Sequence, residues 1–231
     1  MSKKVICFPC AGGNASNFNQ IIQKNKKDFI CIEYSGHWTR YKERLYESIE
    51  DCCESLYSEI AEMITPFDEI CLLGHSMGGI VAYEMAGILG SKGYKVVDLI
   101  LLGCMSPDEM DYRKVTFEND QEIKDFLKRI RQVSEKVLDS GFFSENLLPA
   151  IRRDFENLSD YLRHFCRKTM INANIVCLSG NKDILTSSMK GWQDYTRASF
   201  EYDELEGDHF CFYKSENACF ISELISRKFG M

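Results

Sequence analysis

The stretch CLLGHSMGGIV, residues 71–81, joins an apolar run to a second apolar pattern through a segment that contains three glycines. Its centre, GHSMG at residues 74–78, fits the pattern Gly-X-Ser-X-Gly. A serine held on a tight turn between a strand and a helix has strained backbone angles, and side chains two residues to either side would collide. The pattern therefore predicts a strand, a sharp turn and a helix, with the Ser76 oxygen exposed where the strand ends.

Short apolar runs with β propensity recur along the chain, and helical patterns lie between most of them. The predicted strands are Val5–Phe8, Phe29–Glu33, Glu69–Leu73, Val96–Leu102, Asn174–Leu178 and Ser199–Tyr202. The predicted helices are Ser48–Ile64, Met77–Leu89 and Phe220–Phe229. Strands that alternate with helices form a mostly parallel sheet covered on both faces. We therefore expect a single α/β domain over residues 1–231, with a central sheet of about six to seven strands.

The alternation stops between Cys104 and Asn174, where no strand pattern occurs. Two amphipathic stripes at helical spacing fill this segment, one from Ile123 to Val137 and one from Leu147 to Phe165. We predict a helical insertion over about residues 107–172 that forms a lid above the carboxyl edge of the sheet. Ordinary crossover helices are the alternative.

Composition limits the class of protein. The chain has 231 residues, of which 45% are hydrophobic, and a net charge of −7. Such an acidic chain is not expected to bind nucleic acid. No apolar run has the length of a membrane span, and the first residues lack the apolar core of a signal peptide. We expect a cytoplasmic monomer without membrane contact.

The cysteines are expected to be reduced and structural. There are 11, scattered through apolar segments rather than arranged as a disulfide framework. Cys7 and Cys10 form one CxxC pair, but no second pair and no set of histidines accompanies it. We therefore expect no metal site.

A serine needs a base to become a nucleophile, and the chain offers four histidines. His75 is adjacent to Ser76, so its side chain should point away and pack or hydrogen-bond within the turn. His164 lies in the second stripe of the insertion. His209 lies in a glycine-containing loop after the last predicted strand, which is where this topology places its base. His209 is therefore the candidate base.

An acid that orients the base should follow an earlier strand, in the chain order Ser, Asp, His. The run Ile175–Leu178 ends in a loop that carries Asp183 a few residues beyond a glycine. Asp183 is the candidate, with a solvent-exposed turn aspartate as the alternative. Asp208 is adjacent to His209, which gives it poor geometry for this role.

Backbone N–H groups must stabilise the oxyanion that forms when a serine attacks a carbonyl. One donor is expected at Met77, at the start of the helix after the serine. The second is expected in the segment Phe8–Asn14 after the first strand, where paired glycines allow close backbone approach. We assign it to Ala11; a purely structural tight turn is the alternative.

Four motifs together resemble one family. They are FPCAGG at 8–13, GHSMGG at 74–79, GNKD at 180–183 and GDHFCF at 207–212. In combination they resemble the type II thioesterases of nonribosomal peptide and polyketide assembly lines; medium-chain acyl thioesterases of fatty acid synthesis share the pattern. The resemblance runs from about Val5 to Phe212. The first two motifs together are far more specific than the serine turn alone.

The resemblance implies an α/β-hydrolase fold with a mobile helical lid. It implies hydrolysis of acyl groups from the phosphopantetheine arm of an acyl or peptidyl carrier protein, with no bound cofactor or metal. Ser76 would be the nucleophile, His209 the base and Asp183 its orienting acid. A medium-chain fatty-acyl thioesterase, a small-molecule esterase, an acyltransferase and a non-catalytic carrier-binding protein remain alternatives.

Two further groups of residues are expected near the substrate. The family has a Pro-Gly-Arg-like turn after the second strand, but this chain reads YSGHWTR at 34–40, so His37 and Arg40 are candidates for the rim of the site. His37 as the base is a rival interpretation. Arg152 and Arg153 in the insertion are candidates for contact with an acidic carrier protein, with an exposed helix face as the alternative.

Overall fold

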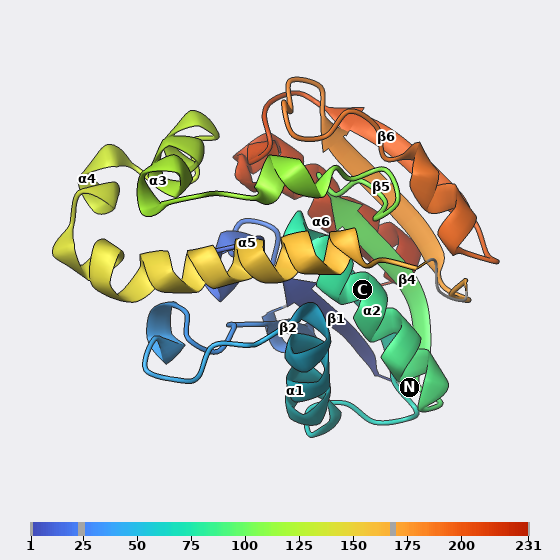
Figure 1. Ribbon diagram of the computed structural model, residues 1–231. Coiled ribbons are helices and arrows are strands. Elements are labelled where there is room, and N and C mark those ends of the chain that lie inside the picture. The colour runs from blue at the N-terminus through green and yellow to red at the C-terminus, as the bar shows by residue number, and fades with distance from the viewer. Residues whose placement is uncertain (1, 23–25, 167–169, 231) are drawn as a thin grey trace.

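A six-stranded parallel sheet forms the centre of the molecule, with strand order β2-β1-β3-β4-β5-β6. The computed structural model describes residues 2–22, 26–166 and 170–230. The strands are β1 (Lys3–Phe8), β2 (Phe29–Cys31), β3 (Glu69–His75), β4 (Lys95–Leu102), β5 (Asn174–Gly180) and β6 (Phe200–Leu205). Each predicted strand is present with small shifts at its ends, and the expected parallel sheet is confirmed (Figure 1).

Helices cover both faces of this sheet. The helices are α1 (Ile49–Ala61), α2 (Met77–Ser91), α3 (Asp120–Arg129), α4 (Glu135–Leu138), α5 (Leu148–Arg163) and α6 (Ser215–Phe229). Shorter helical turns are η1 (Ala15–Phe18), η2 (Lys26–Asp28), η3 (Trp38–Arg40), η4 (Tyr112–Val115), η5 (Phe143–Leu147), η6 (Lys190–Tyr195) and η7 (Cys211–Tyr213). In Figure 1, α1 and α2 lie in front of the sheet and α6 lies behind it.

Side-chain alternation along the strands explains this arrangement. On β3, Leu72 belongs to the core that contains α1 and α2, whereas Leu73 belongs to the core that contains α6. Leu101 and Leu102 divide in the same way on β4. Because successive side chains point to opposite faces, strands that are apolar at every position need a cover on each side.

The turn between β3 and α2 is as tight as its sequence predicts. Ser76 alone separates the two elements and has φ +54° and ψ −122°. A Cβ on Gly74 would lie 2.3 Å from the Gly78 carbonyl oxygen, and one on Gly78 would lie 2.1 Å from the Phe8 carbonyl oxygen. The glycines are therefore needed for contact within the turn and for contact with the end of β1.

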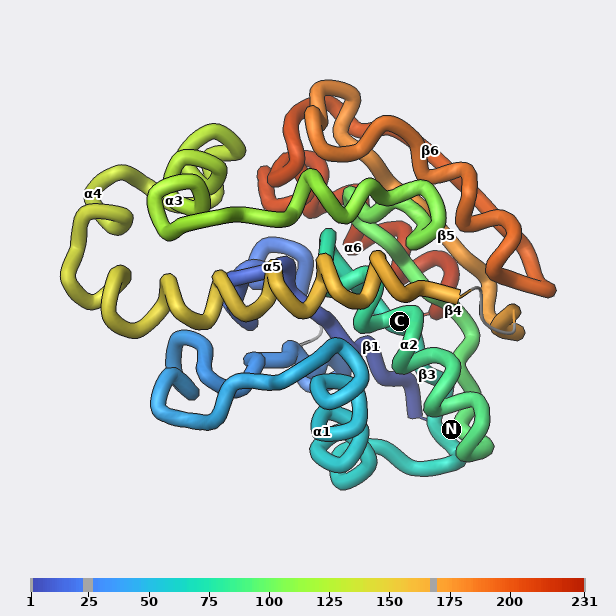
Figure 2. Tube along the Cα trace, in the orientation of Figure 1, coloured from blue at the N-terminus to red at the C-terminus, as the bar shows by residue number. Residues whose placement is uncertain are grey.

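The segment between β4 and β5 carries the predicted helices, but not as two long ones. The stripe from Ile123 to Val137 is divided between two helices: α3 ends at Arg129, Arg131 has φ +58°, and the short α4 begins at Glu135. The second stripe forms η5 and α5. Figure 2 shows the chain leaving β4, passing through α3 and α4 and returning along α5. Residues 167–169 of the predicted insertion lie outside the described residues.

Two features are absent from the described residues. None of their helices is long and apolar enough to cross a membrane. No group of three or more His, Cys, Asp or Glu side chains among them is arranged to hold a metal ion.

Substituting Gly78 tests the steric account of the turn. Gly78→Ala should lower the free energy of unfolding by about 3 kcal/mol, because the new methyl group meets backbone atoms that cannot move aside. Gly87→Ala on the same helix is the control: a Cβ there meets nothing within 4 Å, so stability should rise by roughly 0.5–1 kcal/mol. Urea unfolding measures both, and equal effects of the two substitutions would contradict the account.

Candidate active site

Ser76 opens into a pocket with largely apolar walls at the carboxyl edge of the sheet. Ala11, Gly103 and His209 line it beside Ser76. Most of its remaining wall comes from the segment between β4 and β5. The apolar residues of this part are Met105, Met110, Val115, Phe126, Ile130, Phe155 and Leu158, and the polar ones are Asp111, Lys114 and Gln132. The pocket therefore has polar groups near Ser76 and an apolar region suited to a hydrocarbon group.

His209 and Asp183 form a buried pair. The His209 Nδ1 lies 2.7 Å from Asp183 Oδ2, and the two side chains are 4% and 0% exposed. Burial on its own raises the pKa of Asp183, but the hydrogen bond and charge of His209, together with the Leu185 N–H at 2.8 Å, bring that pKa below its ordinary value. Asp183 is thus a carboxylate that orients the imidazole.

The pairing fixes which nitrogen of His209 faces outward. Because Nδ1–H donates to Asp183, the neutral ring keeps Nε2 as an acceptor. Gly103, with φ +54°, leaves room for the ring: a Cβ there would lie 3.2 Å from His209 Cε1. Among the described atoms no hydrogen bond joins Ser76 Oγ to this imidazole, and such contacts commonly tighten only when substrate binds.

The segment after β1 brings backbone donors to the same pocket. Ala11 lines it, and Met77 is the first residue of α2. No described residue accepts a hydrogen bond from the N–H of Ala11 or of Met77. Both amides therefore stay candidates for the donors to an oxyanion at Ser76.

Side chains from two other segments hold the loop that contains Ala11. The Tyr34 hydroxyl donates to the Pro9 carbonyl oxygen at 3.0 Å, and Trp38 Nε1 donates to the Gly12 carbonyl oxygen at 2.9 Å. Gln132 Nε2 donates to the Ala11 carbonyl oxygen at 2.6 Å. Sequence reasoning missed Gln132, which follows the break after α3 and carries no local motif.

His75 is bonded outside the turn that contains it. Its Nε2 lies 2.9 Å from the His209 carbonyl oxygen and its Nδ1 lies 2.9 Å from the Tyr213 hydroxyl. A carbonyl only accepts, so Nε2 carries the proton and Nδ1 accepts from Tyr213. Burial, and then the charge of His209, hold the pKa of His75 well below its ordinary value. The predicted orientation away from Ser76 is confirmed, but its partners lie in the His209 loop.

The two candidates for the rim of the site lie elsewhere. His37 is 2% exposed, does not line the Ser76 pocket, and contacts Asp154 on α5. Arg40 is paired with Glu43 and Glu59 and is likewise absent from the pocket wall. The structure thus corrects both expectations: the turn folds under α5 rather than over the pocket. The rival interpretation of His37 as the base has no geometric support.

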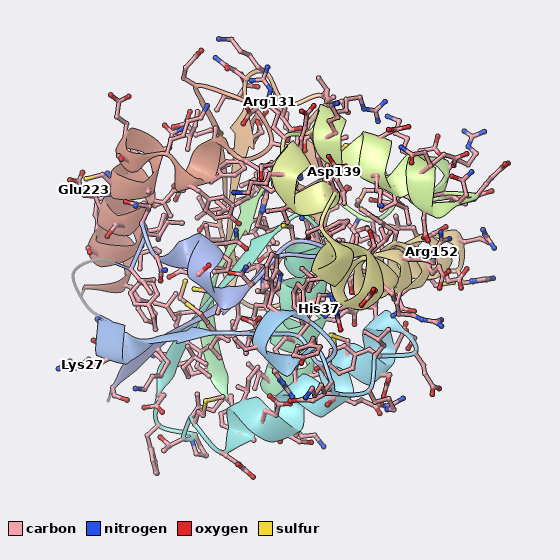
Figure 3. The ribbon with its side chains drawn as sticks, turned by 90° about the vertical axis from the view of Figure 1, so that its left-hand side faces the viewer. Lys27, His37, Arg131, Asp139, Arg152 and Glu223 are labelled. Atoms are coloured by element: carbon pink, nitrogen blue, oxygen red, sulfur yellow. The ribbon has the colours of Figure 1, made fainter. Side chains whose placement is uncertain are left out.

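Arg152 and Arg153 lie on α5, as expected, outside the pocket. Arg152 is bonded to Asp120 and Arg153 lies 3.4 Å from Glu156. Figure 3 labels Arg152 on this helix and His37 close to it. Both arginines therefore present part of their charge to solvent and part to an acidic neighbour.

Comparison with known proteins gives the class. The family model described as "Thioesterase domain" matches residues 3–229. The chain belongs to this family, and it is a thioester hydrolase with an α/β-hydrolase fold.

Individual relatives are distant but cover nearly the whole chain. "Thioesterase TesA" of Mycobacterium marinum is 26% identical over 95% of this chain and 86% of its own length. "Gramicidin S biosynthesis protein GrsT" of Aneurinibacillus migulanus is 27% identical, covering 92% and 84%. The structure is similar to that of RedJ, the thioesterase of the prodiginine pathway in Streptomyces coelicolor, with a TM-score of 0.82 at 23% identity over 96% and 84% of the two chains. The resemblance to type II thioesterases is confirmed.

The protonation state of His75 can be measured directly. Its ring nitrogens should keep the shifts of a neutral, Nε2-protonated imidazole from pH 8 to pH 5.5 in 15N spectra, assigned with a His75→Gln variant. Because its folded-state pKa is depressed, this group's contribution to stability is present above the unfolded value of about 6.5 and is lost as pH falls below it. An imidazolium signal for His75 at pH 5.5 in the folded protein would contradict this assignment.

Proposed function

We propose that this protein removes acyl or aminoacyl groups from the phosphopantetheine arms of carrier proteins in nonribosomal peptide or polyketide biosynthesis. The observation that carries the proposal is the buried His209–Asp183 pair, in which His209 lines the same pocket as Ser76, in a chain of the thioesterase family. The pathway assignment follows the names of relatives, one of which serves gramicidin S biosynthesis. The resulting task is to clear misprimed or stalled acyl units.

The proposed mechanism uses side chains and backbone groups described above. His209 Nε2 takes the proton of Ser76 as its oxygen attacks the thioester carbonyl, while Asp183 holds the ring through Nδ1. The N–H groups of Ala11 and Met77 stabilise the oxyanion. The arm leaves as a thiol with the proton from His209, and a water molecule activated by the same imidazole then releases the acid from Ser76.

The pocket fits the substrate proposed here. Its wall of Phe126, Phe155 and neighbouring aliphatic residues favours an apolar acyl group, and the segment from η4 to α5 acts as a lid over it. The enzyme is proposed to work as a monomer with a transient carrier partner. It needs no cofactor of its own, because the substrate supplies the phosphopantetheine arm.

Substitution of the triad tests the mechanism. Ser76→Ala should abolish turnover of an acyl-carrier thioester, and Asp183→Asn should lower kcat by about 10³–10⁴-fold because the imidazole loses the partner that fixes its tautomer. Ser187→Ala, an exposed serine near Asp183, is the control and should retain wild-type turnover. Wild-type rates in the Ser76→Ala variant would refute the mechanism.

Carrier docking at α5 is tested separately. Reversing Arg152 and Arg153 to glutamate should raise KM for the acyl-carrier thioester several-fold and leave kcat unchanged, because the acidic carrier loses attraction to this face. Lys92→Glu is the control: it also reverses a positive charge, but at the C-terminal end of α2 rather than on α5. An unchanged KM with an unchanged dependence on salt would exclude these arginines from docking.

Substrate comparison separates the other classes. The proposed enzyme should prefer acyl-carrier thioesters to simple oxygen esters with the same acyl group, whereas a small-molecule esterase should not. Product analysis with an added amine or alcohol should give the free acid; a condensed product would indicate an acyltransferase.

A further inference from the structure

Asp154 is an acidic residue on the apolar face of α5 and is only 6% exposed. It lies three residues after Ile151 and four before Leu158, which are both buried in the core. Its Oδ2 accepts a hydrogen bond from the Gly12 N–H at 2.8 Å and also lies 2.8 Å from His37 Nε2. A buried carboxylate is costly unless it is paired, so these two contacts explain how α5 accommodates Asp154.

The hydrogen bonds define the charge on His37. Its Nδ1 lies 3.0 Å from the Ser35 carbonyl oxygen, which only accepts, so Nδ1 is protonated. Its Nε2 faces the Asp154 carboxylate and is therefore also a donor. With both nitrogens protonated the ring is an imidazolium. Burial acts to lower the pKa of His37, but the charge and hydrogen bond of Asp154, together with the Ser35 carbonyl and the charge of Glu33, outweigh it, and the net pKa is raised.

This ion pair acts on the peptide group next to the proposed oxyanion donor. The peptide that joins Ala11 to Gly12 is held at both ends: its carbonyl accepts from Gln132, and its N–H donates to Asp154. Gly12 has φ +67°, and a Cβ on it would lie 2.5 Å from Ile151 Cγ1. Residues of the segment between β4 and β5 therefore hold the backbone at Ala11 in one conformation. The direction of the Ala11 N–H is set by that conformation.

We propose that Asp154 and His37 are positioning residues for the oxyanion hole, which hold the Ala11 amide toward Ser76 from the α5 side of the pocket. The inference rests on the function proposed above. Neither side chain touches the substrate. Asp154 acts through the Gly12 N–H, and His37 is the buried partner of its carboxylate.

Asp154→Asn tests the proposal, because asparagine preserves size but removes the negative charge and one of the two oxygens at the position that contacts both His37 and the Gly12 N–H. We expect kcat with an acyl-carrier thioester to fall about 10–100-fold with KM changed less than threefold. Inhibition by an alkylboronic acid, which forms a tetrahedral adduct on serine, should weaken by a similar factor. The Gly12 amide should exchange with solvent at least tenfold faster.

Two further variants complete the test. Asp160→Asn on the same helix removes an exposed carboxylate and should stay within twofold of wild type in every measurement. His37→Gln keeps a neutral donor toward Asp154 and should show a smaller loss of kcat than Asp154→Asn. It also carries the test if Asp154→Asn does not fold.

The outcomes are distinct. Wild-type kcat, boronate affinity and Gly12 exchange in Asp154→Asn would overturn the proposal, as would a loss confined to KM. The Gly12 exchange rate needs no substrate. It therefore reports on Asp154 even if Ser76→Ala shows that the proposed function is wrong.

Discussion

Close contact between the serine turn and the end of β1 is the constraint on which the site depends. Gly78 lies so near the Phe8 and Pro9 carbonyl oxygens that a methyl group would overlap both. This contact brings the start of α2 next to the loop that follows β1. Ser76 then has a strained backbone at the start of α2, and Ala11 lines the same pocket as Ser76. Strain of this kind, about 1–3 kcal/mol, persists because the surrounding packing enforces it.

The parallel sheet supplies the remaining groups. Because every strand points the same way, the loops after β1, β3, β5 and β6 meet at one edge. Asp183 and His209 come from two of these loops and meet 2.7 Å apart although 26 residues separate them in the chain. His75, at the end of β3, bonds to the His209 carbonyl oxygen and so ties the base to the serine turn. The meeting of Asp183, His209 and the serine turn at this edge is a consequence of topology as much as of residue choice.

Much of this could be predicted from the sequence because it is local or periodic. Each strand is an apolar run, and the glycines around Ser76 mark the turn directly. The positions of Asp183 and His209 follow from chain order. The break after α3 was missed because a continuous apolar stripe does not record that Arg131 adopts a positive φ. Periodicity predicts which side of a helix is buried, but not where the helix ends.

The anchoring groups were missed for a different reason. Gln132, Tyr213 and Asp154 act through long-range contacts that no local pattern encodes. Asp154 did leave a signal, since it is a charged residue on the apolar face of an amphipathic helix, and such a residue requires a buried partner. His37 was expected at the rim because its turn follows β2. Its burial depends on α5, more than a hundred residues later in the chain, which packs over it.

The central claim is that Ser76 carries the acyl group between the arm and water. The most direct measurement is intact and peptide mass spectrometry of the enzyme quenched within milliseconds of mixing with an acyl-carrier thioester. The account predicts an adduct with the mass of the acyl group, located on the peptide that contains Ser76 and absent from the Ser76→Ala variant. Turnover without any such adduct, or an adduct on another residue that forms and decays at the turnover rate, would contradict it.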